Sequence, residues 1–185
     1  GYYLANPIEI IDLSKGGLVW YGGFLSSLFA LALYLRKVRL NFWNVTDLFA
    51  PYIALAQGFG RIGCFLNGCC YGIPTPTGYI FAATFSYENI PRHPTQIYSM
   101  LALFLIFAVL RLWQDKRHFA GEIFLGYCIL YSSKRFLIEF LRVDNPKIFL
   151  GLTISQAVSV VVFLTSSLIF IYKMAQWKKR PINSR

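Results

Sequence analysis

The segment Gly60-Arg61-Ile62-Gly63-Cys64-Phe65-Leu66-Asn67-Gly68-Cys69-Cys70-Tyr71-Gly72 decides how the chain is organised. It follows a long apolar run, and it contains one arginine, four glycines and three of the four cysteines of the chain. An arginine at the end of a membrane-length apolar run is costly unless it has a function. We therefore interpret the segment as the floor of a candidate active site at the end of a membrane helix.

The composition is that of a membrane protein. Of 185 residues, 56% are hydrophobic and 14% are charged, whereas a soluble domain carries about 25% charged residues. The mean hydropathy is +0.51. The net charge of +10 could indicate nucleic acid, but in a chain this apolar it favours anionic lipid headgroups. We expect the lipid bilayer as a partner and no nucleic acid.

Five apolar segments have the length of about 20 residues that a membrane helix needs. They cover residues 17–35, 46–66, 93–112, 120–141 and 153–172. The fold class predicted is an all-α integral membrane protein with five transmembrane helices. Asn44 or Thr46 is expected to cap the second of these helices.

The basic residues predict the orientation and the domain limits. They cluster in residues 36–39, 111–118 and 173–185, and the positive-inside rule places all three clusters in the cytoplasm. Residues 1–16 are then an outer-side lead-in, residues 17–173 the transmembrane helical domain, and residues 174–185 a basic cytoplasmic tail. The long loop 68–92 lies on the outer side.

Arg61 has two readings. A helix-end arginine often extends to the interface and has only a structural role. However, Gly58, Gly60, Gly63 and Gly68 flank Arg61, and they let a ligand approach the backbone closely. A guanidinium binds two phosphate oxygens at once, so Arg61 is a candidate phosphate ligand.

Arg135, Glu139 and Arg142 follow one another at spacings of four and three, which places them on one helix face. A pair formed by Arg135 and Glu139 lowers the cost of both charges in the membrane. The pair is either a self-neutralising structural contact or part of a polar stripe that lines a cavity. Tyr131 lies one turn before Arg135.

The loop and the next helix meet at His93, which is followed by Pro94, Thr95 and Gln96. A single histidine at a helix start is either a cap or brace, or a functional group. His93 and Gln96 are therefore candidate substrate-binding residues as well as structural ones.

The cysteines do not have the spacing of a metal site. Cys64-x4-Cys69-Cys70 differs from the usual C-x2-C pairs, and the chain has only two histidines. Four cysteines also indicate no disulfide framework. The sequence alone thus predicts no metal site and no cofactor, and it favours small packing residues. A reactive thiol would need an electropositive site, which Arg61 could supply.

Five motifs in order give the chain a family resemblance. The first is the opening segment, read as Gly60-Arg61-Ile62-Gly63-x-Phe65-x-Asn67-Gly68-x-x-Tyr71-Gly72. The others are Tyr21-Gly22-Gly23, Asp47-Leu48-Phe49-Ala50-Pro51, His93-Pro94-Thr95-Gln96-Ile97-Tyr98, and Tyr131-x3-Arg135-Phe136-x-x-Glu139-Phe140-x-Arg142 with Gly151-Leu152-Thr153-x-x-Gln156 after it. Together they resemble the prolipoprotein diacylglyceryl transferase family over nearly the whole chain.

The resemblance implies a fold, a reaction and a location. Family members have seven membrane helices, so the five predicted here are the last five, and two helices are expected before Gly1. Members transfer diacylglyceryl from phosphatidylglycerol to the thiol of the lipobox cysteine in a prolipoprotein signal peptide, and glycerol-1-phosphate leaves. The location implied is the bacterial cytoplasmic (inner) membrane, crossed several times.

The resemblance also implies residue roles. Arg61 binds the phosphate, Arg135 is a second essential arginine, Glu139 orients Arg135, and Tyr131 lies near the reacting centre. The catalytic set is completed by Tyr21. The substrate-binding set comprises Arg61, Asn67, Gly72, His93, Gln96 and Arg142.

The chain departs from the family pattern at positions whose residues could take part in proton transfer. Tyr21 stands where the family has histidine, and a tyrosine at its usual pKa of about 10 is a poor base. Cys64 replaces the usual asparagine, Cys69 replaces the usual glutamate, and Ser99 stands where many members have glutamate. Two alternatives follow: a paralogous lipid transferase with another acceptor, or a catalytically silent protein that binds phosphatidylglycerol.

Overall fold

The computed structural model describes residues 19–76, 78–85, 88–142, 147–149 and 151–179. The chain divides into two compact units, Gly1–Val45 and Thr46–Arg185. The predicted lead-in, residues 1–16, lies outside the described residues, and the predicted domain limits stay a prediction.

The first unit contains helix α2, Val19–Lys37, and the first residues of helix α3. α3 covers Phe42–Leu66, so it begins four residues before the predicted start. The side chain of Asn41 accepts hydrogen bonds from the backbone N–H groups of Trp43 at 2.9 Å and Asn44 at 3.2 Å. Asn41 therefore caps α3, and the prediction of Asn44 or Thr46 was wrong.

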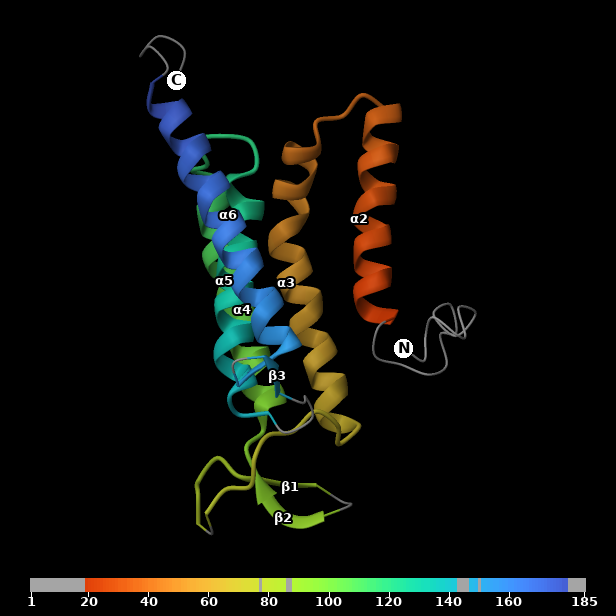
Figure 1. Ribbon diagram of the computed structural model, residues 1–185, viewed down its shortest axis with the longest axis vertical. Helices are drawn as coiled ribbons and strands as arrows, with labels where there is room; N and C mark the ends of the chain where they lie inside the picture. The colour runs from red at the N-terminus through yellow and green to blue at the C-terminus, as the bar shows by residue number, and fades with distance from the viewer. Residues whose placement is uncertain (1–18, 77, 86–87, 143–146, 150, 180–185) are drawn as a thin grey trace. The chain divides into compact units, whose positions relative to one another are not determined.

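The second unit is a helical bundle. After α3 come α4, Thr95–Gln114, α5, Glu122–Glu139, and α6, Ile154–Lys178. Figure 1 shows α3, α4, α5 and α6 side by side. The five helices within the described residues correspond to the five predicted segments, with ends that differ by a few residues.

Two short hairpins modify the prediction of an all-α fold. β1, Ala83–Phe85, pairs antiparallel with β2, Glu88–Arg92, inside the predicted outer loop. β3, Lys147–Phe149, pairs with β4, Leu152–Thr153. Each hairpin directly precedes a helix, α4 or α6 (Figure 1). The loop backbone needs hydrogen-bond partners, and pairing within the loop supplies them.

The core of the bundle lies between α3, α4 and α5. Its buried members are Ala50, Ala54, Leu103, Ile106, Leu110, Ile123 and Tyr127. The two alanines of α3 are fully buried, and small residues of this kind let membrane helices approach closely.

Large apolar side chains cover much of the outer surface of the bundle. Leu105 and Leu112 of α4 are 66% and 75% exposed, and Val161 and Leu168 of α6 are 61% and 67% exposed. Monomeric soluble proteins rarely expose apolar surface on this scale. Two of the described helices, Thr95–Gln114 and Ile154–Lys178, also have the length and hydropathy of a membrane span. These features support a membrane protein.

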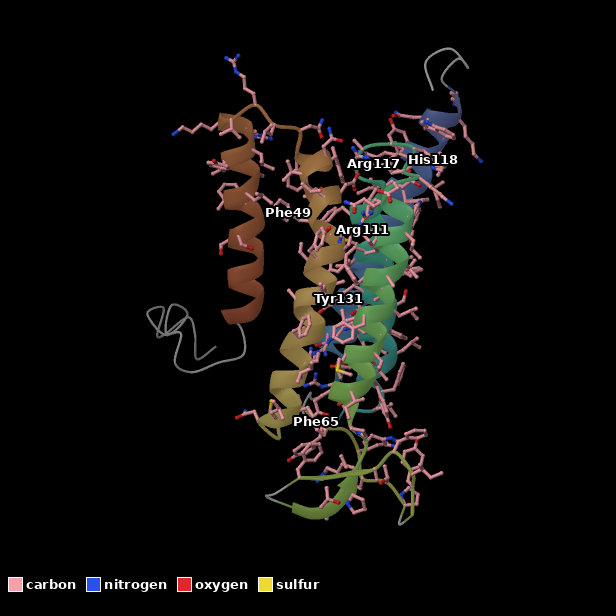
Figure 2. The ribbon with its side chains drawn as sticks, turned by 180° about the vertical axis from the view of Figure 1, so that it is seen from behind. Phe49, Phe65, Arg111, Arg117, His118 and Tyr131 are labelled. Carbon is pink, nitrogen blue, oxygen red and sulfur yellow. The ribbon has the colours of Figure 1, made fainter. Side chains whose placement is uncertain are left out.

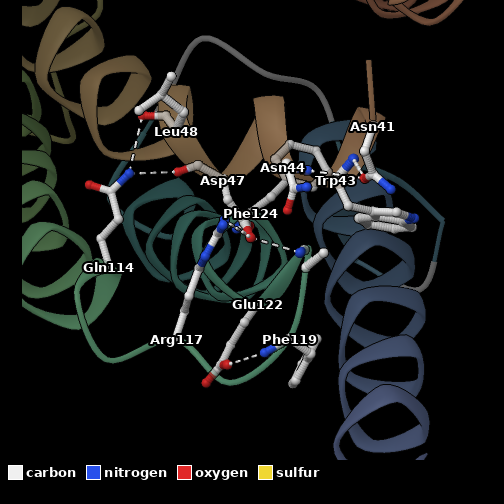
Figure 3. A network of polar contacts seen from close by, with 12 residues as sticks. Asn41, Trp43, Asn44, Asp47, Leu48, Gln114, Arg117, Phe119, Glu122 and Phe124 are labelled. Carbon is white, nitrogen blue, oxygen red and sulfur yellow. Dashed lines mark hydrogen bonds and ion pairs between the residues drawn. The ribbon is translucent and has the colours of Figure 1, made fainter. Parts of the chain in front are cut away.

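The carboxylate of Asp47 holds α3 to the start of α5. It is fully buried and accepts hydrogen bonds from the backbone N–H groups of Gly121 at 2.7 Å and Phe124 at 2.9 Å. Arg117 also donates to it, at 3.2 Å (Figure 3). The sequence places Asp47 near the start of α3, but its charge stabilises the N-terminus of α5.

The turn before α5 is fixed by a second carboxylate. Glu122 is buried and accepts hydrogen bonds from Trp113, from Phe119 and from the backbone and ring of His118. This end of the bundle therefore has two buried carboxylates, and each is surrounded by donors.

Replacing Asp47 by asparagine should destabilise the bundle. Asp47→Asn keeps the shape of the side chain but removes the negative charge to which three donors bind. We expect the free energy of unfolding to fall by about 2 kcal/mol. For a chain of this length the fall in Tm is roughly 4–8 °C. The matched control is Asp115→Asn, because the Asp115 carboxylate is 73% exposed in its pair with Arg111. Thermal unfolding in detergent checks both; equal Tm values for the two variants would contradict the role of Asp47.

Candidate functional site

The candidate site lies in the part of the bundle away from Asp47. Figure 2 shows Arg117 and His118 at one end of the bundle, Phe65 at the other, and Tyr131 between them. Most of the charged residues singled out by the sequence lie on α3 and α5 from the level of Tyr131 toward the Phe65 end.

Arg135 and Glu139 form the predicted ion pair. Arg135 Nη2 lies 3.2 Å from Glu139 Oε2, and the Glu139 side chain is fully buried while that of Arg135 is 18% exposed. Arg135 Nη2 also donates to the hydroxyl of Ser155 on α6, at 2.9 Å. The guanidinium is therefore held from two helices.

Glu139 is fixed in turn by the start of α6. The hydroxyl of Thr153 donates to Glu139 Oε1 at 2.8 Å. Thr153 is also the N-cap of α6: its hydroxyl accepts from the backbone N–H of Gln156, whose side chain accepts from the backbone N–H of Thr153. This capping box fixes Thr153, and Thr153 in turn positions Glu139. The N-cap of α6 and the Arg135–Glu139 ion pair are therefore connected through Thr153.

Lys134 is a further charge that the sequence analysis missed. It is only 8% exposed, and its ammonium lies 4.4 Å from the ring centroid of Tyr131. It interacts electrostatically with the guanidinium groups of Arg61, Arg135 and Arg142. Its position inside an apolar segment was a signal that could have found it, because intramembrane charge indicates a functional site by default.

Arg61, Lys134, Arg135 and Arg142 form what we term the cationic cluster. Like charges brought together at a partly buried site repel one another. Glu139 offsets part of that repulsion. A bound anion would offset more of it, so the arrangement is suited to a phosphate group. Tyr131 borders the cluster, and its ring lies 5.6 Å from that of Tyr127.

Three of the predicted substrate-binding residues have structural contacts. Gly72 is buried, and a Cβ added there would lie 2.5 Å from the carbonyl oxygen of Leu141. His93 Nδ1 lies 3.2 Å from the Tyr98 hydroxyl. Gln96 donates to the carbonyl oxygen of Cys69 at 2.6 Å. These contacts join the loop to α4 and α5, and roles in substrate binding stay predictions.

The structure describes fewer side-chain contacts for the remaining predicted residues. Asn67 is exposed in the turn after α3, and its backbone N–H donates to Gly63 at 2.9 Å. Tyr21 is part of α2, but its side chain lies outside the described residues. Of the predicted residues, Arg61, Arg135 and Arg142 lie near enough to Lys134 to interact with it electrostatically.

An apolar pocket of about 290 Å³ lies between α5 and α6. Its walls include Phe136, Leu137 and Phe163, and Ser132 and Ser159 contribute small side chains. Ser155, which accepts the hydrogen bond from Arg135, lies one turn of α6 before Ser159 of the pocket, so the pocket and the Arg135 contact lie on neighbouring turns of α6. This combination suits a ligand with both a charged head and an apolar tail.

Comparison with known proteins identifies the family of the chain. The family model described as prolipoprotein diacylglyceryl transferase matches residues 1–172. A phosphatidylglycerol–prolipoprotein diacylglyceryl transferase of Clostridium tetani is 38% identical over 178 residues, which cover 95% of this chain and 70% of the relative. The protein of that name from Finegoldia magna is 37% identical over 185 residues, covering 99% and 71%.

A third relative gives the same result. The phosphatidylglycerol–prolipoprotein diacylglyceryl transferase of Bordetella parapertussis is 35% identical over 177 residues, which cover 92% of this chain and 67% of the relative. The match extends over nearly the whole chain in each case, and it includes every member of the cationic cluster. The chain therefore belongs to the prolipoprotein diacylglyceryl transferase family.

Proposed function

We propose that this protein transfers the diacylglyceryl group from phosphatidylglycerol to the thiol of a lipobox cysteine in a prolipoprotein signal peptide. Glycerol-1-phosphate is the leaving group. The names of the curated relatives support the two substrates. The observation that carries the proposal in the structure is the cationic cluster, with Arg135 held between Glu139 and Ser155.

In this proposal the cationic cluster binds the phosphate and stabilises its developing charge. The bond from the glyceryl carbon to the phosphate oxygen breaks, and negative charge accumulates on the departing phosphate. Donors fixed before the reaction stabilise such charge without reorganising. Glu139 and Ser155 keep Arg135 fixed, while Arg61 approaches from α3 and Lys134 from the same helix as Arg135. Tyr131 lies next to the reacting centre.

The apolar pocket between α5 and α6 takes an acyl chain of the lipid. Its aromatic and aliphatic walls, Phe136, Leu137 and Phe163, favour a hydrocarbon. The substrate would then lie with its phosphate at the cationic cluster and one chain along α5. Asn67, Gly72, His93, Gln96 and Arg142 stay candidates for contacts with the headgroup or the peptide, and Tyr21 stays a candidate catalytic residue.

We also propose that the five helices are the last five of a seven-helix fold in the cytoplasmic (inner) membrane. The basic residues of the turn between α4 and α5 then face the cytoplasm, together with those after α2 and α6. The β1–β2 hairpin and the cationic cluster lie toward the outer side, where a translocated signal peptide presents its cysteine.

Replacing Arg61 by alanine should abolish transfer. The assay follows labelled diacylglyceryl from phosphatidylglycerol into a lipobox peptide, and a complementation assay in a transferase-depleted strain supports it, with the first two helices restored. Removing one donor to the developing charge should lower the rate about 100-fold or more. Full activity of Arg61→Ala would exclude the assigned role.

The Arg135–Glu139 pair should affect the rate of transfer through the orientation of the guanidinium as well as through its charge. Arg135→Lys keeps the charge but loses the planar fork, and Glu139→Gln removes the partner that orients it. We expect each to reduce kcat/KM by at least about tenfold. The matched control is Arg111→Lys, since Arg111 makes the same i,i+4 pair on the surface with Asp115. An equal loss in the control variant would show that the assay reports general damage.

The orientation can be tested with an inserted epitope. An epitope placed between Gly78 and Tyr79 should be recognised by antibody in intact spheroplasts, and one placed between Asp115 and Lys116 only after permeabilisation. All four residues are exposed in turns. The reverse pattern of accessibility would overturn the proposed topology.

A further inference from the structure

Three thiols meet at the end of α3. The Sγ atoms of Cys64, Cys69 and Cys70 all lie within 4.8 Å of one another, and those of Cys69 and Cys70 are 3.1 Å apart. None of the three cysteines forms a disulfide, and all three are partly buried. The spacing in the sequence does not resemble a metal motif, so it is the folded turn that creates this group.

The backbone of the turn is shaped to bring the thiols together. The chain reverses at Gly68, where φ is +64°, and the backbone N–H of Cys69 donates back to the carbonyl oxygen of Cys64 at 3.2 Å. Cys70 has a φ of +68°. A residue with a side chain rarely adopts this conformation, and it persists where the surroundings impose it.

The start of α4 imposes this conformation. Thr95 Oγ1 donates to the carbonyl oxygen of Cys70 at 2.7 Å, and Gln96 Nε2 donates to that of Cys69 at 2.6 Å. Thr95 is 2% exposed and Gln96 is 1% exposed. Two buried side chains therefore fix the carbonyl groups of both Cys69 and Cys70. The three thiols are held close together before any ligand binds.

Three sulfur donors select a thiophilic cation such as zinc. Sulfurs at about 2.3 Å from one zinc ion lie about 3.8 Å apart in a tetrahedral arrangement, a separation that the observed spacing already approaches. Three protein ligands are also typical of a catalytic zinc site, whose fourth position is open to water or substrate.

We propose that Cys64, Cys69 and Cys70 bind a zinc ion whose open fourth position takes the thiol of the acceptor cysteine. This inference rests on the proposed function. It supplies what the residue pattern lacks: tyrosine stands at position 21 and cysteine at position 69, where the family has histidine and glutamate. A thiol that coordinates zinc is deprotonated, so no base of ordinary basicity is needed.

The position of the site suits this role. Cys64 follows Arg61 by three residues on α3, which puts both on neighbouring turns of one face, about 4.5 Å apart along the helix axis. The acceptor sulfur would thus be held beside the residue proposed to bind the phosphate. Nucleophile and leaving group are then held by adjacent parts of one helix.

The chemical step balances. The acceptor thiol releases its proton to solvent when it coordinates, and the sulfur attacks the glyceryl carbon that carries the phosphate. A C–S bond forms and the C–O bond breaks. Its electron pair stays on the oxygen of the departing glycerol-1-phosphate, next to the cationic cluster. Nothing is oxidised or reduced.

The test begins with cobalt(II) chloride added to the purified, reduced chain in detergent. We expect one cobalt per chain, with the intense sulfur-to-cobalt absorption that thiolate ligands produce, and displacement by zinc. Cys64→Ser and Cys69→Ser should lose the absorption. The matched control is Cys128→Ser, because Cys128 lies on α5 outside the group and is also partly buried.

The second step adds the acceptor. A lipobox peptide with cysteine should change the visible spectrum of the cobalt-loaded protein, whereas the same peptide with serine should not. Absence of sulfur-to-cobalt absorption in the wild-type chain, or its retention in Cys64→Ser, would overturn the site. The wild-type outcome does not depend on the folding of any variant, and Cys128→Ser shows whether a cysteine-to-serine change by itself removes the absorption.

Activity separates this inference from the proposed function. Zinc-loaded protein should transfer diacylglyceryl at least about tenfold faster than protein treated with a chelator. Equal transfer by both forms would overturn the zinc inference and leave the transferase function standing. Zinc bound through the three cysteines, with the peptide-dependent spectral change but no transfer in either form, would refute the function and support the site.

Discussion

The ion pair between Arg135 and Glu139 joins helix packing to the candidate chemistry. A buried carboxylate is costly unless it has a cation and hydrogen-bond donors near it. Glu139 has the guanidinium of Arg135 on its own helix beside one oxygen, and its other oxygen accepts a hydrogen bond from Thr153 at the start of α6. Thr153 is available because the capping box holds it. The β3–β4 turn, the start of α6 and the orientation of Arg135 therefore depend on one another.

At the other end of the bundle a buried carboxylate is also surrounded by donors, but there it holds two helices together. Asp47 is as deeply buried as Glu139, but its donors are mostly backbone N–H groups at the start of α5, and its cation is Arg117. Its charge is offset within the protein. Near Arg135, by contrast, Glu139 pairs with Arg135, and Lys134 interacts electrostatically with Arg61, Arg135 and Arg142. This gathering of cations is the feature on which the proposed binding of a substrate anion rests.

The sequence predicted the parts of this structure that depend on local pattern. Apolar length located all five helices, and the i,i+4 spacing of Arg135 and Glu139 predicted their pair. It could not locate partners from other elements. The start of α3 was misplaced because Asn41, not Asn44 or Thr46, caps it. Nothing in the sequence shows that α5 begins beside Asp47, so the contacts of Asp47 with that N-terminus could not be predicted.

The turn that contains Cys69 and Cys70 also depends on partners that the sequence could not locate. By the family resemblance, the positions of Cys64 and Cys69 usually hold asparagine and glutamate, so a carboxylate is absent from the segment that contains Arg61. Cys70 Sγ donates to Cys69 Sγ in this structure, and the proposed cation would replace that contact with a bond to each sulfur. The hydrogen bonds from Thr95 and Gln96 to the turn hold the thiols together, and this geometry is what makes a shared cation the consistent chemical reading of the turn.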